Sequence, residues 1–461
     1  MSALARSSQD QQPRSPWAGP RGNWLLGCLR QIQNDPLTLY RNAWSEYGDY
    51  VRVRILPKMY LFLVAHPDAI EHILFKNHKN YRKPDVVTRP SRLLMGNGIF
   101  TSEGDFWLRQ RRIMQPVFLK HQLVKLGSFM GQAVDGLIEQ WSKPGVPNSF
   151  DIVPEMMRLA LRIASTALVG TDISADADDI GHAYRMAFEY VSYKMNGRLM
   201  LPLWIPTGRN REFKRSIALL DDVVIQIIES RRKAQTPIND LLGLLMAAHD
   251  EESGAGMSDQ QLKDEVITLL TAGHETVGAA LSWSWYLLGQ NADVQEALRD
   301  EAAGRLQGRT PTIEDLPHLP LATAVFEESM RLYPPAWGVP REAIEADDLQ
   351  GHPVPKGAII TLAQFITHRH PDFWTEPDRF DPTRFLPAPA QTRHKCAYFP
   401  FGGGPRICIG NHLAMIEGAL VLAALAQRFH FTLVPGQTVA ADATFTLRPK
   451  SGVQVIIRKR S

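Results

Sequence analysis

Hydrophobic and polar residues follow a helical period along most of this chain. Apolar residues recur every three to four positions from Pro36 to Tyr47, from Asp105 to about residue 248, and from Asn411 to Arg428. This spacing predicts amphipathic helices. The longest such pattern starts at Ser258-Asp-Gln-Gln, which fits a capping box, and stops at Gly289, which fits a helix end. We therefore expect one helix long enough to cross a whole domain.

A second pattern, with period two, predicts strands. Residues 50–55 alternate between apolar and polar, an apolar run follows at residues 60–64, and Pro57-Lys58-Met59 lies between them, so we expect a hairpin. Later runs at residues 358–362, 445–447 and 453–457 also read as strands. Residues 81–104 fit neither period and predict a long irregular segment. Helices dominate overall.

The composition is that of an ordinary globular protein. The chain has 461 residues, of which 44% are hydrophobic and 21% charged, and its net charge is only +3. The basic residues are spread out and no nucleic-acid-binding motif occurs, which excludes nucleic acid as a partner. Three cysteines do not form a disulfide framework and fit a reducing, cytoplasmic compartment.

Nothing in the chain predicts a membrane anchor. Residues 1–20 are rich in Ser, Gln, Pro and Arg, have no apolar core, and are expected to be disordered. The long apolar run at residues 266–288 carries Glu275 near its middle, and a carboxylate there costs about 2.5–3.5 kcal/mol in a bilayer. We interpret this run as a buried helix. No linker follows residue 20, so residues 21–461 are expected to form a single domain.

The richest chemistry lies in Phe401-Gly-Gly-Gly-Pro-Arg-Ile-Cys-Ile-Gly410. A thiolate binds iron well, and glycines leave room for a large flat group. A zinc site is disfavoured because no second Cys/His pair follows Cys408 and His412. The loop lacks the Gly-Lys-Ser/Thr of a nucleotide site and the βαβ unit of a dinucleotide site. An inert buried cysteine and a cysteine nucleophile both remain open on this stretch alone.

The same stretch resembles the heme-binding loop of the cytochrome P-450 family. Phe401, Gly404, Cys408 and Gly410 fill the motif positions, and Arg406 precedes the cysteine by two residues. The resemblance implies heme b as cofactor, with Cys408 as the axial ligand of the iron. A thiolate ligand favours O–O cleavage.

A second motif, Ala272-Gly-His-Glu-Thr276, lies in the middle of the long helix. His274-Glu275 does not start a zinc-protease motif, because Gly278 stands where the second histidine would be. Taken alone, Thr276 is best interpreted as a mid-helix threonine whose hydroxyl bonds back to a carbonyl one turn earlier. The motif resembles the oxygen-binding groove of the same family. That resemblance implies that Thr276 and Glu275 pass protons to oxygen and that Ala272 and Gly273 line the substrate pocket.

Two further motifs point to the same family. Glu328 and Arg331 are one helical turn apart among apolar residues, which favours a buried ion pair. They resemble the family's Glu-x-x-Arg motif, whose third, structural partner would be Arg379. That segment, Glu376-Pro-Asp-Arg-Phe380, has aspartate where the family more often has glutamate.

The heme carboxylates would have their own cluster of donors. Trp107 and Arg111 lie one turn apart and resemble the family's heme-edge helix. Arg341 and Arg406 match two further positions that bind the heme propionates. Trp337 and Val339, just before Arg341, are expected beside the heme on the substrate side. The alternative for Trp337 is a ring that turns away and packs into the β lobe.

The resemblance covers residues 20–458 and implies a soluble, bacterial-type cytochrome P-450. The implied fold is mainly α with a small β-rich lobe near the N-terminus, and heme lies between the long helix and the Cys408 loop. The implied reaction inserts one oxygen atom from O₂ into a lipophilic molecule, such as a terpenoid, steroid or fatty acid. An oxygen-independent or peroxide-using heme-thiolate enzyme and a non-enzymatic heme-binding protein are the alternatives.

The implied partners follow from what the chain lacks. No flavin or ferredoxin module is present, so electrons must arrive from separate proteins such as a ferredoxin with its reductase. Five basic residues are expected to form a docking face for it: Arg109, Arg112, Lys120, Lys125 and Lys395. We expect a monomer. The apolar loop at residues 200–206 is expected to line a substrate entrance, touch a membrane or pack on the protein's own core.

Overall fold

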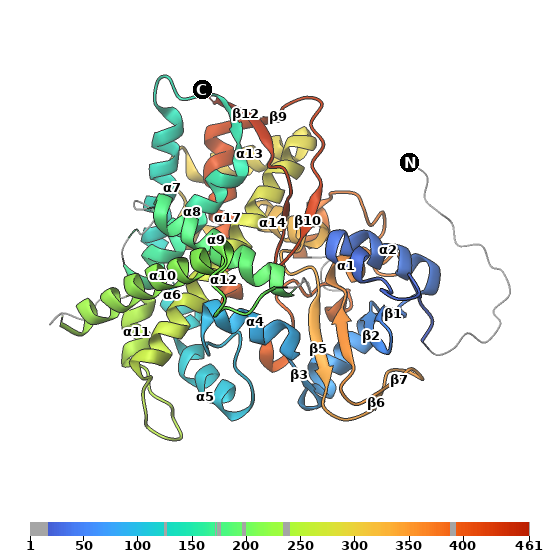
Figure 1. Cartoon of the computed structure of the whole chain (residues 1–461). Helices are drawn as coiled ribbons and strands as arrows, with labels where there is room; N and C mark the ends of the chain where they lie inside the picture. Colours follow the sequence, from blue (N-terminus) through green and yellow to red (C-terminus); the bar gives the residue numbers. More distant parts are fainter. Residues whose placement is uncertain are drawn as a thin grey trace.

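The computed structural model describes residues 17–123, 127–170, 172, 177–195, 200–233, 240–387 and 393–460. A large helical body occupies one side of the molecule and a small β-rich lobe the other (Figure 1). The long helix α12 (Asp259–Gln290) crosses the helical body. Its N-cap is confirmed, because the Ser258 hydroxyl accepts the N–H of Gln261 at 3.2 Å. It runs one residue past Gly289, whose missing side chain leaves room for Leu433 instead of ending the helix.

Several helices pack around α12. The helix α8 (Ile152–Val169) packs along α12, and α17 (Asn411–Arg428) and α14 (Pro320–Leu332) also contact it. The other helices of eight or more residues are α2 (Pro36–Tyr47), α4 (Asp85–Met95), α5 (Gly104–Met114), α7 (Gly127–Ser142), α9 (Ala177–Met195), α10 (Gly208–Lys233) and α13 (Ala292–Leu306). Shorter ones include α1 (Leu29–Asn34), α3 (Pro67–Glu71), α6 (Lys120–Leu123), α11 (Leu241–Ala247) and α15 (Gln364–Thr367).

The β lobe is built on one five-stranded sheet with the order β1-β2-β8-β5-β3. Its strands are β1 (Tyr50–Leu56), β2 (Met59–Val64), β3 (Tyr81–Arg82), β5 (Val339–Ala343) and β8 (Ile359–Leu362). The predicted hairpin is confirmed, since β1 and β2 pair antiparallel from Tyr50 with Val64 to Leu56 with Met59. Parallel pairing of β2 with β8 joins the N-terminal hairpin to a segment nearly 300 residues later in the chain.

Three smaller sheets complete the strands. One contains β4 (Ser149–Asp151), β12 (Gln454–Lys459) and β9 (Phe429–Leu433) in that order. Two-stranded pairs are formed by β6 (Asp347–Asp348) with β7 (Pro353–Val354), and by β10 (Ala441–Ala443) with β11 (Leu447–Pro449). The strand predicted at residues 445–447 is therefore wrong for its first two residues, because Phe445 lies in the turn between β10 and β11.

Two other predictions need correction. The segment 81–104 is not irregular throughout, because α4 forms within it even though Pro90 lies inside the helix. The predicted disordered segment 1–20 extends too far, because Trp17 is only 4% exposed and stacks edge-on against Tyr50 and Phe62. Its indole N–H also donates to the Pro353 carbonyl at 2.6 Å. Residues 1–16 lie outside the described residues.

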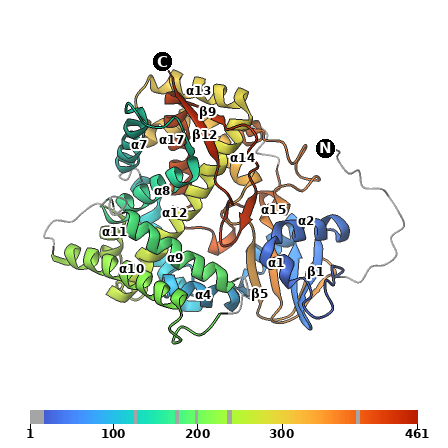
Figure 2. The same cartoon turned by 45° about the horizontal axis from the view of Figure 1, so that its top comes forward.

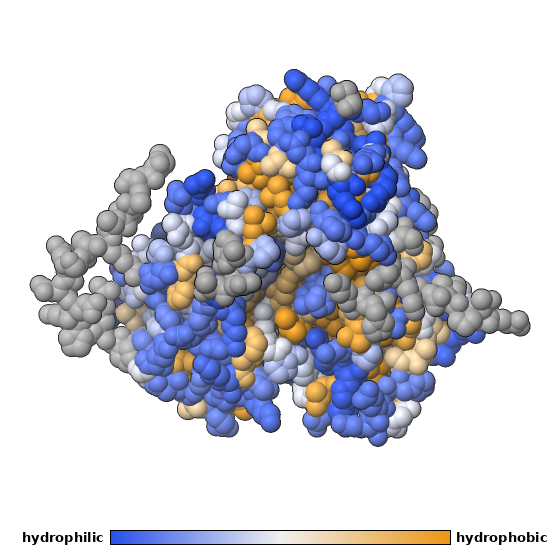
Figure 3. All heavy atoms as spheres, turned by 180° about the vertical axis from the view of Figure 1, so that it is seen from behind, coloured by the Kyte–Doolittle hydropathy of each residue, from blue (hydrophilic) through white to orange (hydrophobic). Residues whose placement is uncertain are grey.

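The surface is mostly polar on the face that Figure 3 shows, with hydrophobic residues toward its centre. Within the described ranges, none of the helices has both the length and the apolar character that a membrane crossing requires.

Candidate active site

The thiol of Cys408 lies between a short 3₁₀ turn, η8 (Gly404–Arg406), and the start of α17. The Cys408 N–H donates to the Phe401 carbonyl at 2.9 Å, which closes the loop. Gly404 has φ +67°, and a Cβ there would lie 1.8 Å from the Leu74 carbonyl oxygen. Two of the three consecutive glycines, Gly403 and Gly404, thus allow the loop to contact Leu74 and Phe75. Only Gly402 and, beyond the cysteine, Gly410 have open space at the Cβ position.

Cys408 faces a hollow inside the molecule. Its side chain is exposed, yet burial raises the pKa of its thiol. A thiol that is accessible and also enclosed by protein lies on the wall of an internal hollow. A hydrogen bond from the Gly410 backbone N–H and the charge of Arg111 lower the same pKa. These two groups stabilise the thiolate, which is the form that binds a metal.

Arg111 and Arg406 carry polar atoms that point to an anionic ligand. The Nη1 of Arg111, in α5, donates to the Ile407 carbonyl at 2.9 Å, but its buried Nε has no partner among the described residues. The Arg406 guanidinium lies 4.1 Å from the centre of the Trp107 ring and pairs with Glu103, and its buried Nη1 is also without a described partner. Buried N–H groups require acceptors.

The cation cluster fits the carboxylates of a heme. Arg341 is 8% exposed, and burial lowers the pKa of its guanidinium to about 10, with Arg406 as the second influence. Arg341 and Arg406 lie near each other, and among the described residues Glu103 is the acid that pairs with Arg406, so the two guanidinium groups leave an excess of positive charge. The two propionates of heme b would satisfy that charge and the unpartnered N–H groups of Arg111 and Arg406. The predicted residues Trp107, Arg111, Arg341 and Arg406 therefore suit their expected role.

Lys83 belongs to the same region and was not predicted from the sequence. Its ammonium group donates to the carbonyls of Ile99 at 3.1 Å, Phe100 at 2.6 Å and Ser102 at 3.2 Å. Burial lowers the pKa of Lys83 to about 7, and Glu103, 4.0 Å away, opposes that shift. Lys83 thus fixes the loop that follows α4. A lone lysine before a proline carries no sequence signal for such a role.

The middle of α12 holds the predicted acid–alcohol pair, Glu275 and Thr276. Ala272 is exposed although it lies at the centre of a largely buried helix, which places open space against this turn. The Thr276 hydroxyl donates to the Ala272 carbonyl at 2.6 Å, as an isolated mid-helix threonine does. Gly273 is different, because its Cβ position lies 3.5 Å from Ala164 on α8. That distance is an ordinary van der Waals contact, so a methyl group would fit at this position.

Glu275 is a buried acid with one hydrogen-bonding atom free. Burial raises the pKa of its carboxyl, and Arg448, at 3.8 Å, lowers it again. Its Oε2 has no hydrogen-bond partner within the described ranges. The neighbouring His274 is neutral, because burial lowers its pKa to about 4. A buried carboxyl with a raised pKa and an oxygen without a described partner suits proton transfer.

The structural ion pair is confirmed, but its third partner is not Arg379. Arg331 and Glu328 are fully buried, with Nε and Nη2 of the arginine at 2.7 and 2.8 Å from the carboxylate oxygens. The side chain that joins Glu328 is Arg384, at 3.5 Å. Arg379 is exposed and pairs with Glu376 at 2.9 Å, and only its backbone carbonyl accepts a bond from Arg331. Arg-Phe occurs twice in this segment, and the second copy is the one that packs on α14.

Trp337 does not face the pocket. Its indole N–H donates to the Thr444 carbonyl at 3.2 Å, and its ring lies 5.7 Å from the ring of Tyr40 in α2. The ring thus packs into the apolar core of the β lobe, and its predicted place in the substrate pocket is wrong. Val339 is half-buried in β5 and packs on a second cluster of that lobe.

Three aromatic side chains from distant segments meet instead. Phe445, in the turn between β10 and β11, lies 4.6 Å from the ring of Phe188 in α9 and 5.8 Å from that of Phe100 in the loop fixed by Lys83. None of the three belongs to a sequence motif. Their spacing along the chain gave no signal, because only the tertiary fold brings them together.

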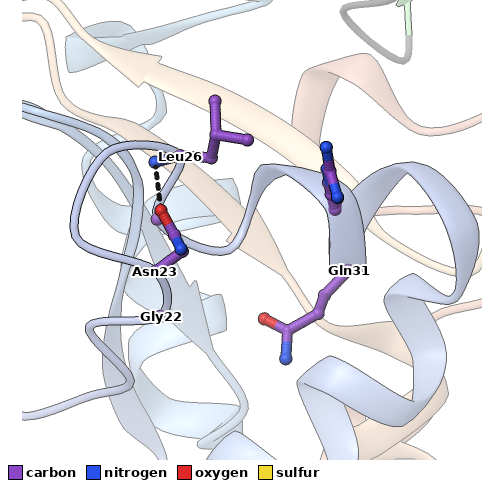
Figure 4. Close-up of a pocket in the computed structure, with 6 residues that line it drawn as sticks. Gly22, Asn23, Leu26 and Gln31 are labelled. Atoms are coloured by element: carbon purple, nitrogen blue, oxygen red, sulfur yellow. Dashed lines mark hydrogen bonds between the residues drawn. The ribbon is translucent and has the colours of Figure 1, made fainter.

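The pocket in Figure 4 lies away from these residues. It has a volume of about 310 Å³ and is bounded by the N-terminal segment before and within α1, where the Leu26 N–H donates to the Asn23 side chain at 3.1 Å (Figure 4). Its lining is Gly22, Asn23, Leu26, Gly27, Arg30 and Gln31. It contains no residue of the four motifs and therefore is not the site of the chemistry.

The predicted basic docking face is largely neutralised. Arg112 pairs with Asp250 at 2.9 Å, and Lys395 pairs with Glu71 at 2.6 Å. Arg109 donates to the Gly256 carbonyl at 2.9 Å. The Lys120 side chain and all of Lys125 lie outside the described part of the chain.

Comparisons with known proteins agree with this geometry. The family model "Cytochrome P450" matches residues 18–456. Cyclooctatin synthase from Streptomyces melanosporofaciens is 34% identical over 422 residues, 91% of each chain. Pentalenene oxygenase from Streptomyces avermitilis is 30% identical over 426 residues, covering 92% of this chain and 93% of its own.

Solved structures give the same result. The heme domain of cytochrome P450DA superposes with a TM-score of 0.88 at 25% identity, over 97% of this chain and 98% of its own. A cyanobacterial P450 with bound retinoic acid has a TM-score of 0.83 at 30% identity, over 96% of this chain and 99% of its own. The thiol loop, the cation cluster and the acid–alcohol pair thus lie in the fold that these relatives share. The chain belongs to the cytochrome P450 family and is a heme b-dependent monooxygenase.

Proposed function

We propose that this P450 inserts one oxygen atom from O₂ into a cyclic terpenoid, by hydroxylation or epoxidation. The observation that carries the proposal is the similarity to enzymes whose names denote cyclic alkenes and alkenols. These are cyclooctatin synthase, cyclooctat-9-en-7-ol 5-monooxygenase, at 34% identity, and pentalenene oxygenase. A steroid or a fatty acid is the less favoured substrate.

The aromatic trio supports a rigid apolar substrate. The Phe445 ring lies against both Phe100 and Phe188, and aromatic rings contribute apolar area without polar demands. Their large flat surfaces match a polycyclic skeleton better than a flexible charged chain, which would need a cationic anchor. The pocket of a hydrocarbon-oxidising enzyme is expected to be mostly apolar, with few polar groups.

Each motif residue has a defined task in this proposal. Cys408 ligates the heme iron, and heme supplies the chemistry that activates oxygen. Burial raises the pKa of the Cys408 thiol, and the Gly410 N–H and Arg111 oppose that rise and so favour the thiolate. Arg341 and Arg406, with Trp107, hold the heme carboxylates and fix the orientation of the ring.

Protons reach the reaction through the middle of α12. Thr276 can exchange its bond to the Ala272 carbonyl for one to oxygen and then donate its own proton. Glu275, with its free Oε2, takes a proton from outside and restores it to the hydroxyl. The short segment around Ala272 leaves the space in which O₂ and substrate meet.

We also propose that the enzyme is a cytoplasmic monomer that receives electrons from a separate ferredoxin and its reductase. In support, the three cysteines of the sequence are too few and too scattered to hold an iron–sulfur cluster. These are free, in keeping with a reducing compartment. The docking partner must tolerate a face on which Arg112 and Lys395 are already paired.

A ligand screen followed by turnover tests the proposal. The purified holoenzyme is titrated with cyclic terpene hydrocarbons, terpene alcohols, steroids and fatty acids of matched size, and the heme spin-state shift is recorded. Cyclic terpenoids are expected to give the largest shifts. Turnover with ferredoxin, reductase and NADPH under ¹⁸O₂ should give product with one ¹⁸O atom. A spin shift confined to steroids or fatty acids would contradict the substrate class, and product without label would contradict the reaction.

A further inference from the structure

The loop of residues 96–103 joins α4 to α5 and carries Phe100. The helix α4, which leads into this loop, packs against α9 and α12 (Figure 2). The ring centres of Phe100 and Phe445 lie 5.8 Å apart, and both side chains are only half-buried, so each ring keeps some apolar surface uncovered. Because Phe445 also lies against Phe188, the position of Phe100 sets one side of this aromatic wall.

Lys83 holds the two carbonyl groups that flank Phe100. Its ammonium group donates to the Ile99 carbonyl at 3.1 Å and to the Phe100 carbonyl at 2.6 Å, which are the peptide oxygens before and after the Phe100 Cα. The same nitrogen lies 5.8 Å from the centre of the Phe100 ring, within the range of a cation–π interaction. Lys83 therefore restrains both the backbone and the ring of Phe100.

Glu265 holds the same peptide segment from α12. It is 0% exposed, and its Oε2 accepts the Ile99 N–H at 2.9 Å. Burial raises the pKa of Glu265 to about 8, and the charge of Lys83 opposes that rise. Ala272 follows Glu265 by about two helical turns, or about 10 Å along the axis, so both lie on one face of α12. The loop is thus anchored on the face that presents Ala272 to open space.

We propose that Lys83 and Glu265 are positioning residues that fix Phe100 and thereby set the orientation in which a cyclic substrate is oxidised. Neither residue touches the substrate. A wall that is held in one arrangement favours one orientation of a rigid ligand, whereas a freed ring must be ordered each time a ligand binds. The inference rests on the proposed function for its substrate class, but the anchoring of Phe100 can be measured without a substrate.

Other hydrogen bonds hold the loop without flanking Phe100. The Asp264 Oδ2 accepts the Asn97 N–H at 2.8 Å, near the start of the loop. Arg92, an exposed residue of α4, donates from Nη2 to the Thr101 carbonyl at 3.0 Å. Arg92→Gln is therefore a matched control, because it removes one carbonyl bond from the same loop and leaves the two carbonyls beside Phe100 in place.

The protonation state of Lys83 gives a second test. An ammonium group has three donors for its three carbonyl partners, whereas a neutral amine has two. Burial lowers the pKa of Lys83 to about 7, Glu103 and Glu265 oppose that shift, and Arg406 and Arg341 add to it. Heme carboxylates held by the two arginines would move the titration to higher pH. The loop should therefore loosen as the pH rises.

The heme-loaded variants Lys83→Met, Glu265→Met, Glu265→Gln and Arg92→Gln test the anchoring without a substrate. Backbone hydrogen exchange at residues 99–102 should be about tenfold faster in both methionine variants. Their affinity for 4-phenylimidazole should fall about fivefold, while their affinity for the smaller imidazole stays unchanged. Glu265→Gln keeps an acceptor for the Ile99 N–H and should behave like the unchanged enzyme, as should Arg92→Gln in ligand binding.

Turnover of one cyclic terpenoid then tests the effect on orientation. The ratio of regioisomeric products should change several-fold in both methionine variants and stay constant in Arg92→Gln. Between about pH 6 and about pH 9, the ratio in Glu265→Gln should move toward that of Lys83→Met, which should not vary with pH. Glu265→Gln cannot ionise, so this profile reports on Lys83 even if Lys83→Met fails to fold.

Two results would overturn the inference. One is unchanged hydrogen exchange and 4-phenylimidazole affinity in the folded methionine variants. The other is an equal effect of Lys83→Met and Arg92→Gln on ligand binding, which would show that any lost bond in the loop acts alike. If no terpenoid is oxidised, the proposed function fails, while hydrogen exchange and the two imidazoles still decide whether Lys83 and Glu265 fix Phe100.

Discussion

The Arg448 guanidinium lies 3.8 Å from the Glu275 carboxylate and thereby connects the middle of α12 to the strand β11. Burial raises the pKa of Glu275, and Arg448 opposes that rise. Arg448 also lies 3.7 Å from Asp442 in β10. A hairpin that is far from Glu275 in the sequence therefore opposes the effect of burial on its carboxyl.

Replacing Arg448 should shift the pH dependence of coupled turnover. In Arg448→Gln the influence that lowers the pKa of Glu275 is gone, so the carboxyl stays protonated to higher pH. If the relay starts from the ionised carboxyl, the acidic limb of product formed per NADPH consumed moves to higher pH. Asp442→Asn is the control, because it removes the other neighbour of Arg448 and leaves Glu275 paired. If the acidic limb stays in place in Arg448→Gln, Glu275 does not take part in the proton relay.

Cys408→Ala should abolish the thiolate-type Soret band of the reduced carbon monoxide complex. The enzyme has two other cysteines, and both are buried away from the cation cluster. Burial raises the pKa of Cys396 to about 12, which disfavours a thiolate there. Cys396→Ala and Cys28→Ala should keep the band. Its survival in Cys408→Ala would mean that another cysteine binds the iron.

Thr276→Ala should leave heme and substrate binding nearly unchanged while electrons are diverted to peroxide or water. The reason is that the hydroxyl contacts only the Ala272 carbonyl, at 2.6 Å, and contributes little to packing. We expect product per NADPH to fall about tenfold or more. Thr276→Ser keeps the hydroxyl and should restore most of the coupling. Coupling that is equal in the alanine and serine variants would assign the hydroxyl a purely local role.

Arg384 and Arg379 should differ sharply in their effect on stability. Arg384→Ala leaves the buried Glu328 carboxylate without its second arginine, and breaking a buried pair costs about 3–5 kcal/mol. Arg379→Ala removes an exposed pair with Glu376, which costs about 0.5 kcal/mol or less. Thermal or denaturant unfolding of the two heme-loaded variants measures the difference. Equal losses would show that Glu328 does not depend on Arg384.

The comparison of Arg379 with Arg384 also shows which features the sequence alone could not predict. The local features were predictable: the Ser258 cap, the hairpin β1–β2 and the Glu328–Arg331 spacing all depend on neighbours a few residues apart. The choice between Arg379 and Arg384 was not, because both precede phenylalanine and only the packing of the 3₁₀ turn Pro382–Phe385 on α14 distinguishes them.

The directions of side chains were the second feature that could not be predicted from the sequence. The motifs pointed to Cys408 and to candidate residues for the heme carboxylates, but they gave no direction for Trp337 in its proline-rich segment. Lys83 and the aromatic trio were missed because their roles depend on carbonyls and rings from distant segments. No spacing rule reports such contacts.

Trp337 and Phe445 offer a direct test of which aromatic residue controls substrate orientation. Trp337 is anchored by its bond to Thr444 and by the Tyr40 ring, so Trp337→Ala leaves a cavity in the β lobe and should cost about 3 kcal/mol of stability. Its effect on the ratio of regioisomeric products should be small. Phe445→Ala removes the ring that contacts both Phe188 and Phe100, and should change that ratio several-fold with a smaller loss of stability. Both variants are compared by unfolding and by product analysis with one terpenoid substrate. A large change in regioisomers for Trp337→Ala, with none for Phe445→Ala, would reverse the two roles and return the indole to the pocket wall.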